Sequence, residues 1–446
     1  MRAFAHSPTS ALPAITDDEH AHAVPSRAVG LDSTALNIEI YCSGGCTVMS
    51  VIRPISLEVP ESDLVDLAAR LQRPRFPSNC HGDGWSHGTS TTYLRELAHY
   101  WRDEYDWRTA EATINRLPNF EYSSSMGPIH FVHTRSTVPD AVPLILTHGW
   151  PWTFLDYAPL LQMLTEPGPG KPAFNLVVPS LPGFCLSARA AGPNWWETAD
   201  IWAELMTALG YETFGAVGGD WGAWVTAQLG HKYPERLIGI HLFDAARLDA
   251  WGTNRPWDLF EPARQNMSTQ ELDTFLAFER KAASHVTVQV LDPLTLAHAL
   301  NDSPIGLCSW LVERRRSWSD CGGDLESVYT KEDLITTTML YWLTDSVASS
   351  LCFYPSAVER PWTPVHRGSP LVQAPTAIST FEHHARKPGP WVDDYYNMQW
   401  RSTHQKGGHF SPREQPGQVA ADLQRSFGHF TRKKNGRRTA QPARMW

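Results

Sequence analysis

The chain has 446 residues, of which 42% are hydrophobic and 19% are charged, the composition of a globular protein of roughly one to three domains rather than of a disordered chain. Its net charge of −9 at pH 7 excludes the basic balance typical of nucleic-acid-binding proteins. The seven cysteines are scattered and no run of ~20 apolar residues occurs, so we expect a soluble cytoplasmic protein without a disulfide framework or a transmembrane anchor.

The N-terminal part of the chain predicts an accessory region. Residues 1–50 mix Ser, Pro, Ala, His and Gly without periodicity, and we expect them to be poorly ordered apart from a short strand near Leu36–Tyr41. Apolar residues at helical spacing then predict one helix around Leu64–Leu71 and a second around Tyr93–Trp101. Neither helix carries a cluster of titratable groups, so residues 51–135 are expected to pack as a layer on a larger body.

The following stretch, residues 136–245, alternates strands with helices. A helix is predicted at Trp202–Leu209, and short apolar runs predict strands at Ile129–His133, Pro143–Thr147, Asn175–Pro179, Phe214–Val217 and Leu237–Phe243. Alternation of this kind is typical of a parallel sheet in a three-layer α/β fold.

A long helical segment then interrupts this pattern. Residues 246–365 are rich in tryptophan, and an insertion of this size between two sheet strands predicts a cap over the site. The sheet resumes in residues 366–430, which hold two predicted strands and a last helix at Pro375–Phe381, Asn397–Arg401 and Gln418–Phe427. Residues 431–446 predict a basic flexible tail.

The segment Val217–Ala223 is the most informative of the chain. It reads Val-Gly-Gly-Asp-Trp-Gly-Ala, and its small residues permit the strained strand-to-helix turn known as a nucleophile elbow. The residue at the tip is Asp220. A carboxylate is already ionised at neutral pH and attacks saturated carbon directly, which suits epoxides and alkyl halides as substrates. The alternative interpretation is a glycine-rich turn with a solvated aspartate.

An ester formed on Asp220 needs a general base and an acid that orients it. His409 follows two glycines after the last strand, where a loop delivers an imidazole to the elbow, and we predict it as the base. Glu382, directly after a strand, is the favoured orienting acid because it lies between nucleophile and base in chain order. The alternatives are Asp244, after the strand that follows the elbow, and Asp393 or Asp394, which are expected to face solvent.

The same chemistry needs donors for the oxyanion and an acid for the departing alkoxide. Backbone N–H groups of Trp221, after the nucleophile, and Trp150, in the loop after an earlier strand, are the predicted oxyanion donors. Tyr354, near the end of the cap, is the predicted proton donor to the alkoxide; the alternative is a half-buried structural tyrosine. Cys42 and Cys46 have no partner pair nearby in the sequence, so we expect no metal site.

With these residues in place, the chain resembles the microsomal-type epoxide hydrolases, which are α/β-hydrolase proteins with an N-terminal accessory region. The likeness covers roughly residues 54–430 and rests on Trp101–Arg108, His148–Pro151, Pro179–Phe184, Gly218–Gly222, Ala299–Pro304 and Gly407–Phe410. The resemblance implies an α/β-hydrolase fold, with a mostly parallel central sheet and a helical cap. It also implies Asp220 as nucleophile, Glu382 as acid, His409 as base and Tyr354 as one of two lid tyrosines. It implies no cofactor, with a small hydrophobic epoxide and water as reactants; we leave a homodimer open.

The sequence departs from this family at three positions. The position of the family's second lid tyrosine falls on His285. We expect one of three consequences: Tyr354 works alone, His285 donates a hydrogen bond in place of the missing tyrosine, or epoxide opening is weakened. Trp152 and Cys185 stand where the family usually has glycine, and we expect them to reshape the pocket. Two other functions fit these residues: a haloalkane-type dehalogenase, and a non-hydrolytic member that binds or cyclises a hydrophobic epoxide.

Overall fold

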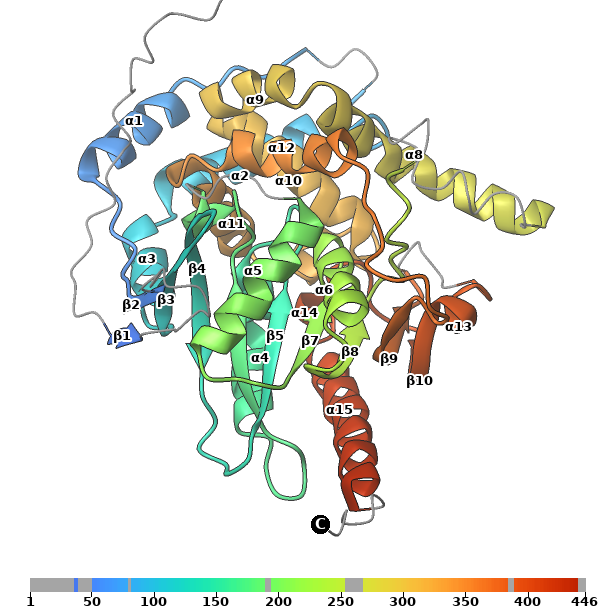
Figure 1. Ribbon diagram of the computed structural model, residues 1–446. Coiled ribbons are helices and arrows are strands. Elements are labelled where there is room, and N and C mark those ends of the chain that lie inside the picture. The colour runs from blue at the N-terminus through green and yellow to red at the C-terminus, as the bar shows by residue number, and fades with distance from the viewer. Residues whose placement is uncertain are drawn as a thin grey trace, which may run out of the picture.

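The computed structural model describes residues 36–38, 50–78, 82–188, 194–252, 268–383 and 389–439. Within these ranges a 10-stranded sheet crosses the centre of the molecule in the order β1-β2-β3-β4-β6-β5-β7-β8-β9-β10. Helices cover both of its faces, and a layer of cap helices lies over one edge (Figure 1).

Six strands form the parallel part of the sheet and confirm the predicted α/β-hydrolase class. They are β5 (Val142–Thr147), β6 (Phe174–Pro179), β7 (Phe214–Gly218), β8 (Leu237–Leu242), β9 (Val372–Phe381) and β10 (Tyr396–His404). Parallel strands bring their carboxyl ends to the same edge, so the loops after β5, β7, β8, β9 and β10 meet there.

Helices bury both faces of this parallel sheet, which explains why its strands are nearly continuous apolar runs. Helices α5 (Trp195–Ala208) and α6 (Trp221–Lys232) pack together, as do α4 (Ala158–Thr165) and α15 (Pro416–Thr439). Helix α15 continues to Thr439, into the segment predicted as a basic flexible tail.

The N-terminal half of the sheet is antiparallel. Its strands are β1 (Leu36–Ile38), β2 (Ser50–Pro54), β3 (Asn119–Ser124) and β4 (Gly127–Thr134), and β4 joins the parallel part by pairing with β6. The sequence analysis did not predict β3, because the alternation of polar and apolar residues in its sequence Asn-Phe-Glu-Tyr-Ser-Ser covers only four residues. Most of residues 1–50, expected to be poorly ordered, lie outside the described residues.

The accessory region has three helices, α1 (Glu61–Leu71), α2 (Thr91–Asp103) and α3 (Trp107–Asn115), and the first two pack on the cap. The short α3 was not predicted. Helices α1 and α2 both contact the cap helix α10 (Pro304–Trp318), and α2 also contacts the cap helix α11 (Lys331–Leu343). The hydroxyl of Thr89 donates to the carbonyl of Ser309 at 2.8 Å, and the hydroxyls of Tyr105 and Thr336 are 3.0 Å apart. The accessory layer therefore holds the cap from outside.

The cap is the predicted helical insertion between β8 and β9. Its main helices are α8 (Thr269–Leu291), α9 (Pro293–Asp302), α10 (Pro304–Trp318), α11 (Lys331–Leu343) and α12 (Val347–Glu359). Short elements complete the fold: η1 (Phe154–Tyr157), η2 (Cys185–Ser187), η3 (Leu325–Ser327), α13 (Val392–Tyr395) and α14 (Ser411–Glu414). Across the described ranges, no helix combines the length and apolar character needed to cross a membrane.

Candidate active site

A sharp turn joins β7 to α6 and carries Asp220. The backbone of this residue has φ 52° and ψ −132°, a conformation that a residue with a side chain adopts only under strain. A Cβ on Gly218 would lie 2.1 Å from the carbonyl oxygen of Gly222, and a Cβ on Gly222 would lie 2.0 Å from that of Thr147. Glycine is required at both positions, and the turn holds the aspartate at the carboxyl edge of the sheet.

Two backbone amides hold the carboxylate of Asp220. Its Oδ1 accepts hydrogen bonds from the N–H groups of Trp150 at 2.9 Å and Trp221 at 2.8 Å. Trp150 lies in the loop after β5 and Trp221 begins α6, so the two predicted donors come from different strand ends. Two N–H groups directed at one carboxyl oxygen have the arrangement of an oxyanion hole.

His409 lies beside the other oxygen of the same carboxylate. Its Nε2 is 3.3 Å from Oδ2 of Asp220. The backbone N–H of His409 donates to the carbonyl of Trp318 at 2.9 Å, so the end of cap helix α10 holds the loop in place. Trp152 and Trp318 contact the imidazole edge-on, with ring centroids 5.4 and 5.1 Å away. The imidazole of His409 thus faces the predicted nucleophile inside an aromatic wall.

Glu382 lies where β9 ends, next to the loop that carries His409. Its backbone N–H donates to the carbonyl of His404 at 2.8 Å, and that of His383 donates to Gly407 at 3.2 Å. The end of β9 and the base loop are therefore joined by backbone hydrogen bonds on both sides of Glu382. This position is compatible with the predicted orienting role, which stays a prediction.

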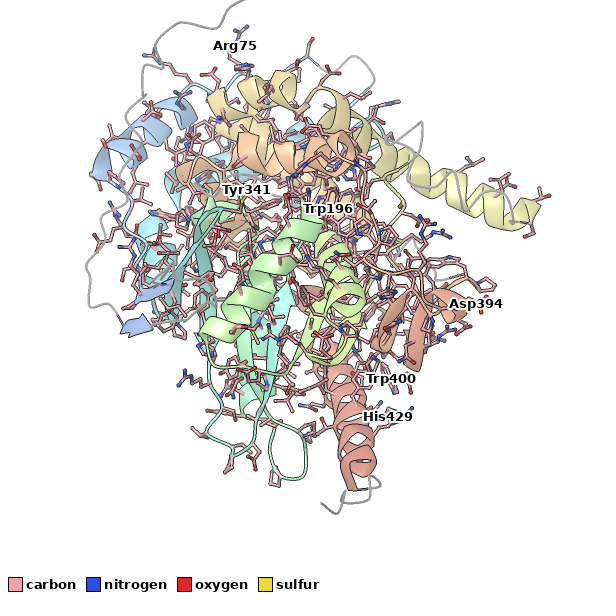
Figure 2. All side chains as sticks on the ribbon, in the orientation of Figure 1. Arg75, Trp196, Tyr341, Asp394, Trp400 and His429 are labelled. Atoms are coloured by element: carbon pink, nitrogen blue, oxygen red, sulfur yellow. The ribbon has the colours of Figure 1, made fainter. Side chains whose placement is uncertain are left out.

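The alternative acids occupy different environments. Asp244 is buried after β8, and its Oδ2 accepts a 2.6 Å hydrogen bond from the backbone N–H of Asp220. Asp244 therefore supports the strained elbow directly. Asp393 and Asp394 are exposed in α13, and Figure 2 shows Asp394 at the periphery of the molecule.

Both predicted cap residues contact the ring of Trp150, one of the two predicted oxyanion donors. Tyr354 lies in α12 and is 2% exposed. Its ring contacts the rings of Trp221 and Trp150 edge-on, with ring centroids 4.9 and 6.3 Å apart. His285, from α8, stacks on Trp150 with centroids 5.6 Å apart and planes only 7° from parallel. The rings of His285 and Tyr354 are 5.8 Å apart. The structure therefore brings His285 to the site although the sequence there lacks a tyrosine.

Trp152 and Cys185 are the two other departures from the family pattern, and both are buried. Trp152 is fully buried and packs against the rings of His409 and Phe410. Cys185 is fully buried with φ 46°, a left-handed conformation that glycine would adopt without strain. The backbone at residue 185 therefore keeps the conformation that favours the family's glycine.

Sequence reasoning missed the role of His148, although it begins the recognised His-Gly-Trp-Pro motif. Its Nδ1 lies 2.9 Å from the carbonyl of Gly149, and its Nε2 accepts from the N–H of Leu181 at 3.1 Å. Burial lowers the pKa of His148 to about 4, so the ring is neutral and Nδ1 carries the proton. A neutral imidazole thus ties the loop after β5 to the loop after β6.

A second group that the sequence did not reveal is the buried ion pair of Arg315 and Asp156. Three consecutive arginines, residues 314–316, resemble a solvated helix face, and nothing local shows that Arg314 and Arg315 are buried. Elsewhere in the described part of the chain, no group of three His, Cys, Asp or Glu residues is arranged to hold a metal ion.

A parallel sheet, a strained turn at its carboxyl edge and a helical cap inserted after β8 define an α/β-hydrolase. The family model for the alpha/beta hydrolase fold matches residues 142–289, and that for the epoxide hydrolase N terminus matches residues 52–157. A Stigmatella aurantiaca protein provisionally described as an epoxide hydrolase is 36% identical over 389 residues, covering 84% of each chain. The chain belongs to the epoxide hydrolase family and is a hydrolase.

Further relatives and solved structures agree. Epoxide hydrolase 1 of Oryctolagus cuniculus is 28% identical over 412 residues, which cover 84% of this chain and 89% of the relative. The juvenile hormone epoxide hydrolase of Bombyx mori superposes with a TM-score of 0.73 at 25% identity, covering 86% of this chain and 96% of that one. The Aspergillus niger epoxide hydrolase gives a TM-score of 0.70 at 26% identity, covering 85% and 96%.

Proposed function

We propose that Asp220 opens an epoxide by direct nucleophilic attack. Oδ2 forms a bond to a ring carbon, the carbon–oxygen bond of the epoxide breaks, and the departing oxygen takes the phenolic proton of Tyr354, with His285 as a second hydrogen-bond donor. The observation that carries this proposal is the asymmetric setting of the carboxylate. Oδ1 is held by two N–H groups, whereas Oδ2 faces His409 at 3.3 Å.

The second half of the reaction hydrolyses the ester on Asp220. His409 removes a proton from water, and the water oxygen attacks Cγ of the aspartate. The oxyanion that develops on Oδ1 is stabilised by the N–H groups of Trp150 and Trp221. Collapse breaks the bond between Cγ and Oδ2, and Oδ2 leaves with the substrate carbon as the second hydroxyl of a vicinal diol, taking the remaining proton of the water, while the water oxygen stays in the carboxylate of Asp220. The proton taken by His409 returns through solvent to Tyr354, so water is added overall.

The proposed orienting acid is Glu382. Its position at the end of β9, joined by backbone hydrogen bonds to the base loop, supports this role. The proposed substrate is a small hydrophobic epoxide, because the groups that surround the carboxylate are mainly aromatic rings from Trp150, Trp221 and Tyr354. An apolar wall binds apolar substituents and excludes bulk water from the ester.

Isotope labelling tests the covalent mechanism. The protein is mixed in excess with a panel of small aliphatic and aromatic epoxides in heavy-oxygen water, and the products and the peptide containing residue 220 are analysed by mass spectrometry. Because water attacks Cγ, the first turnover places the label in the carboxylate of Asp220 and not in the diol. Label appearing first in the diol would exclude the ester, and formation of neither product would exclude hydrolysis.

A variant separates the two half-reactions. His409→Gln removes the base but leaves the nucleophile, so a covalent adduct with the mass of the epoxide should accumulate on the protein. Asp220→Asn is the matched control, because it removes the nucleophile and should give no adduct. An adduct on Asp220→Asn would place the covalent bond on another residue.

A further inference from the structure

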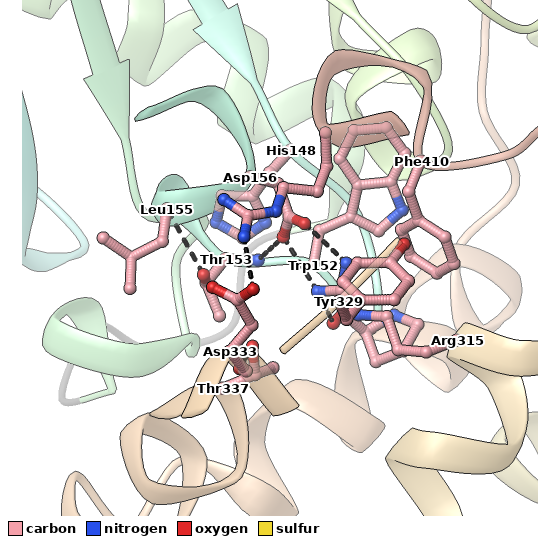
Figure 3. Close-up of polar contacts among 12 residues, drawn as sticks. His148, Trp152, Thr153, Leu155, Asp156, Arg315, Tyr329, Asp333, Thr337 and Phe410 are labelled. Carbon is pink, nitrogen blue, oxygen red and sulfur yellow. Dashed lines mark hydrogen bonds and ion pairs between the residues drawn. The ribbon is translucent and has the colours of Figure 1, made fainter. Parts of the chain in front are cut away.

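A buried arginine of the cap contacts the loop that carries the oxyanion donor. Arg315, on α10, is 2% exposed. Its Nη1 and Nη2 bind the two oxygens of Asp156 at 2.5 and 2.9 Å, and Nη2 also donates to the carbonyl of Pro151 at 2.9 Å (Figure 3). Pro151 is the residue directly after Trp150, whose N–H binds the carboxylate of the predicted nucleophile. The guanidinium therefore fastens the loop immediately beside its functional amide.

Asp156 extends this attachment along the same loop. Its Oδ2 accepts a hydrogen bond from the N–H of Thr153 at 2.8 Å, which closes the capping box at the start of η1. A second cap residue contacts the loop from α11, where the hydroxyl of Tyr341 donates to the carbonyl of Trp152 at 2.8 Å. Two successive carbonyls after the oxyanion donor, those of Pro151 and Trp152, are thus bound by cap side chains.

The same guanidinium also packs on the loop of the base. The Cζ atom of Arg315 lies 4.2 Å from the ring centroid of Phe410, the residue after His409. Tyr329 lies on another side, with its centroid 5.4 Å from Cζ. Arg315 therefore touches both loops that bring working groups to Asp220, one through hydrogen bonds and one through a cation–π contact.

From these contacts we infer that Arg315 is a positioning residue for ester hydrolysis: it fixes the N–H of Trp150 and the ring of His409 relative to Asp220. The inference rests on the proposed function. Arg315 does not reach the reacting atoms and acts through the backbone of Pro151 and the ring of Phe410. Without the guanidinium, the carbonyl of Pro151 loses its partner and the loop loses its link to α10.

Stability alone is a weak reason for this buried pair. Two charges removed from water lose much solvation, and apolar residues of similar volume often replace such pairs with no loss of stability. Unlike an apolar packing contact, the pair is directional, because the planar guanidinium binds a carboxylate and a carbonyl in a fixed geometry. Fixed geometry is what an oxyanion donor requires, since it acts at 2.7–3.1 Å from the developing charge.

The two half-reactions depend on this geometry to different extents. Opening of the epoxide develops charge on the substrate oxygen, which lies toward Tyr354 in the proposed mechanism. Hydrolysis of the ester develops charge on Oδ1 and needs His409 placed for water. Displacement of the Trp150 amide and of His409 should therefore slow hydrolysis of the ester more than its formation.

Two variants of the pair test the role of Arg315 without leaving a buried charge alone. Arg315→Met combined with Asp156→Asn removes both charges, and the amide oxygen of the asparagine still accepts from the N–H of Thr153. Arg315→Lys keeps the positive charge beside Asp156 but lacks the fork that binds Pro151 as well. The matched control is Arg316→Met on the same helix, because Arg316 packs on Trp85 and binds the carbonyl of Gly323 away from the site.

Each variant is followed in single-turnover quenched flow with intact-protein mass spectrometry. The probe is styrene oxide or, if it is turned over faster by the wild type, another epoxide of the panel. We expect the hydrolysis rate of the ester to fall about 10- to 100-fold in both Arg315 variants, less than for outright loss of an oxyanion donor. Ester formation should change by less than about 3-fold, so the adduct accumulates, whereas Arg316→Met behaves as wild type.

The outcomes distinguish the possible failures. Wild-type rates of ester hydrolysis in both Arg315 variants, with or without a lower Tm, would overturn the positioning role and reduce the pair to a structural contact. Equal slowing of both half-reactions would overturn it as well, because a general loss of structure has that effect. If the wild type forms neither ester nor diol from any epoxide of the panel, the proposed function fails, and the positioning role fails with it.

Discussion

Substitution of Gly149 by alanine should disable the site by displacing the carboxylate of Asp220. An added Cβ at residue 149 would lie 2.3 Å from both Cβ and Oδ1 of Asp220 and 2.6 Å from Cγ. Real Cβ contacts are essentially never shorter than 3.0 Å. The elbow backbone is itself fixed by Asp244, whose carboxylate binds the N–H of Asp220, so the side chain has to move away from the loop.

The size of the effect follows from these distances. Relief of a 2.3 Å contact requires a movement of about 1 Å, which takes Oδ1 out of hydrogen-bond range of Trp150 and Trp221, now 2.9 and 2.8 Å away. Loss of one oxyanion donor reduces kcat by about 10²- to 10³-fold, and a 1 Å misplacement by about 10²-fold. We therefore expect Gly149→Ala to lower kcat by about 10³-fold, or roughly 4 kcal/mol.

Steady-state conversion of the best panel epoxide, measured beside thermal unfolding, tests this reasoning. Gly417→Ala is the matched control, because a Cβ there meets nothing within 4 Å and lies early in α15; it should leave kcat unchanged. A Gly149→Ala protein with a kcat within about 3-fold of the wild type would refute the argument. It would show that the carboxylate does not need its two backbone donors.

Three further substitutions address the cap, the acid and the base loop. Tyr354→Phe should lower epoxide turnover by about 10²- to 10⁴-fold while leaving any release of halide from alkyl halides intact, because only the alkoxide needs a proton. Glu382→Gln should slow ester hydrolysis by at least about 10²-fold in the same quenched-flow assay, because His409 loses its orienting charge. Burial raises the pKa of Glu414 from 4.5 to about 7, so its contribution to stability is complete below pH 4.5 and is lost as pH rises through 7. Relative to that of Glu414→Gln, the free energy of unfolding of the wild type should therefore fall by on the order of 3 kcal/mol as pH rises from 4.5 to above 7. Denaturant unfolding measures this difference.

Controls and contrary results differ among the three. Tyr105→Phe, which removes a hydroxyl that contacts Thr336 outside the site, should keep full epoxide turnover, and an equal loss in both tyrosine variants would contradict the proton-donor role. Asp394→Asn, at an exposed position, controls for Glu382. Unchanged hydrolysis in Glu382→Gln would leave Asp244 as the acid to test next. A constant stability difference between wild type and Glu414→Gln from pH 4.5 to 8 would contradict a raised pKa.

Much of the site could be read from the sequence because its constraints are local. Asp220, Trp221 and the elbow glycines lie within one short segment, and a turn with positive φ and close backbone contacts leaves little choice of residue. The parallel strands are apolar runs because they are buried on both faces. Chain order then placed His409 and Trp150 at the same sheet edge as the elbow, and the family pattern directed attention to Tyr354 and His285.

The tertiary structure alone decided which groups support these residues. In the sequence, Arg315 is one of three consecutive arginines and nothing marks it as buried. Its partners Asp156 and Pro151 lie more than 150 residues earlier in the chain. From the sequence, Asp244 was a lesser alternative for the orienting acid. In the structure, its carboxylate accepts a hydrogen bond from the backbone N–H of Asp220 at the elbow. Periodicity and glycine spacing report local backbone geometry, but burial and ion pairing depend on which distant segments the fold brings together. For that reason the sequence by itself determined which groups are the predicted reacting ones, and the packing of the cap on the sheet decided how these groups are held.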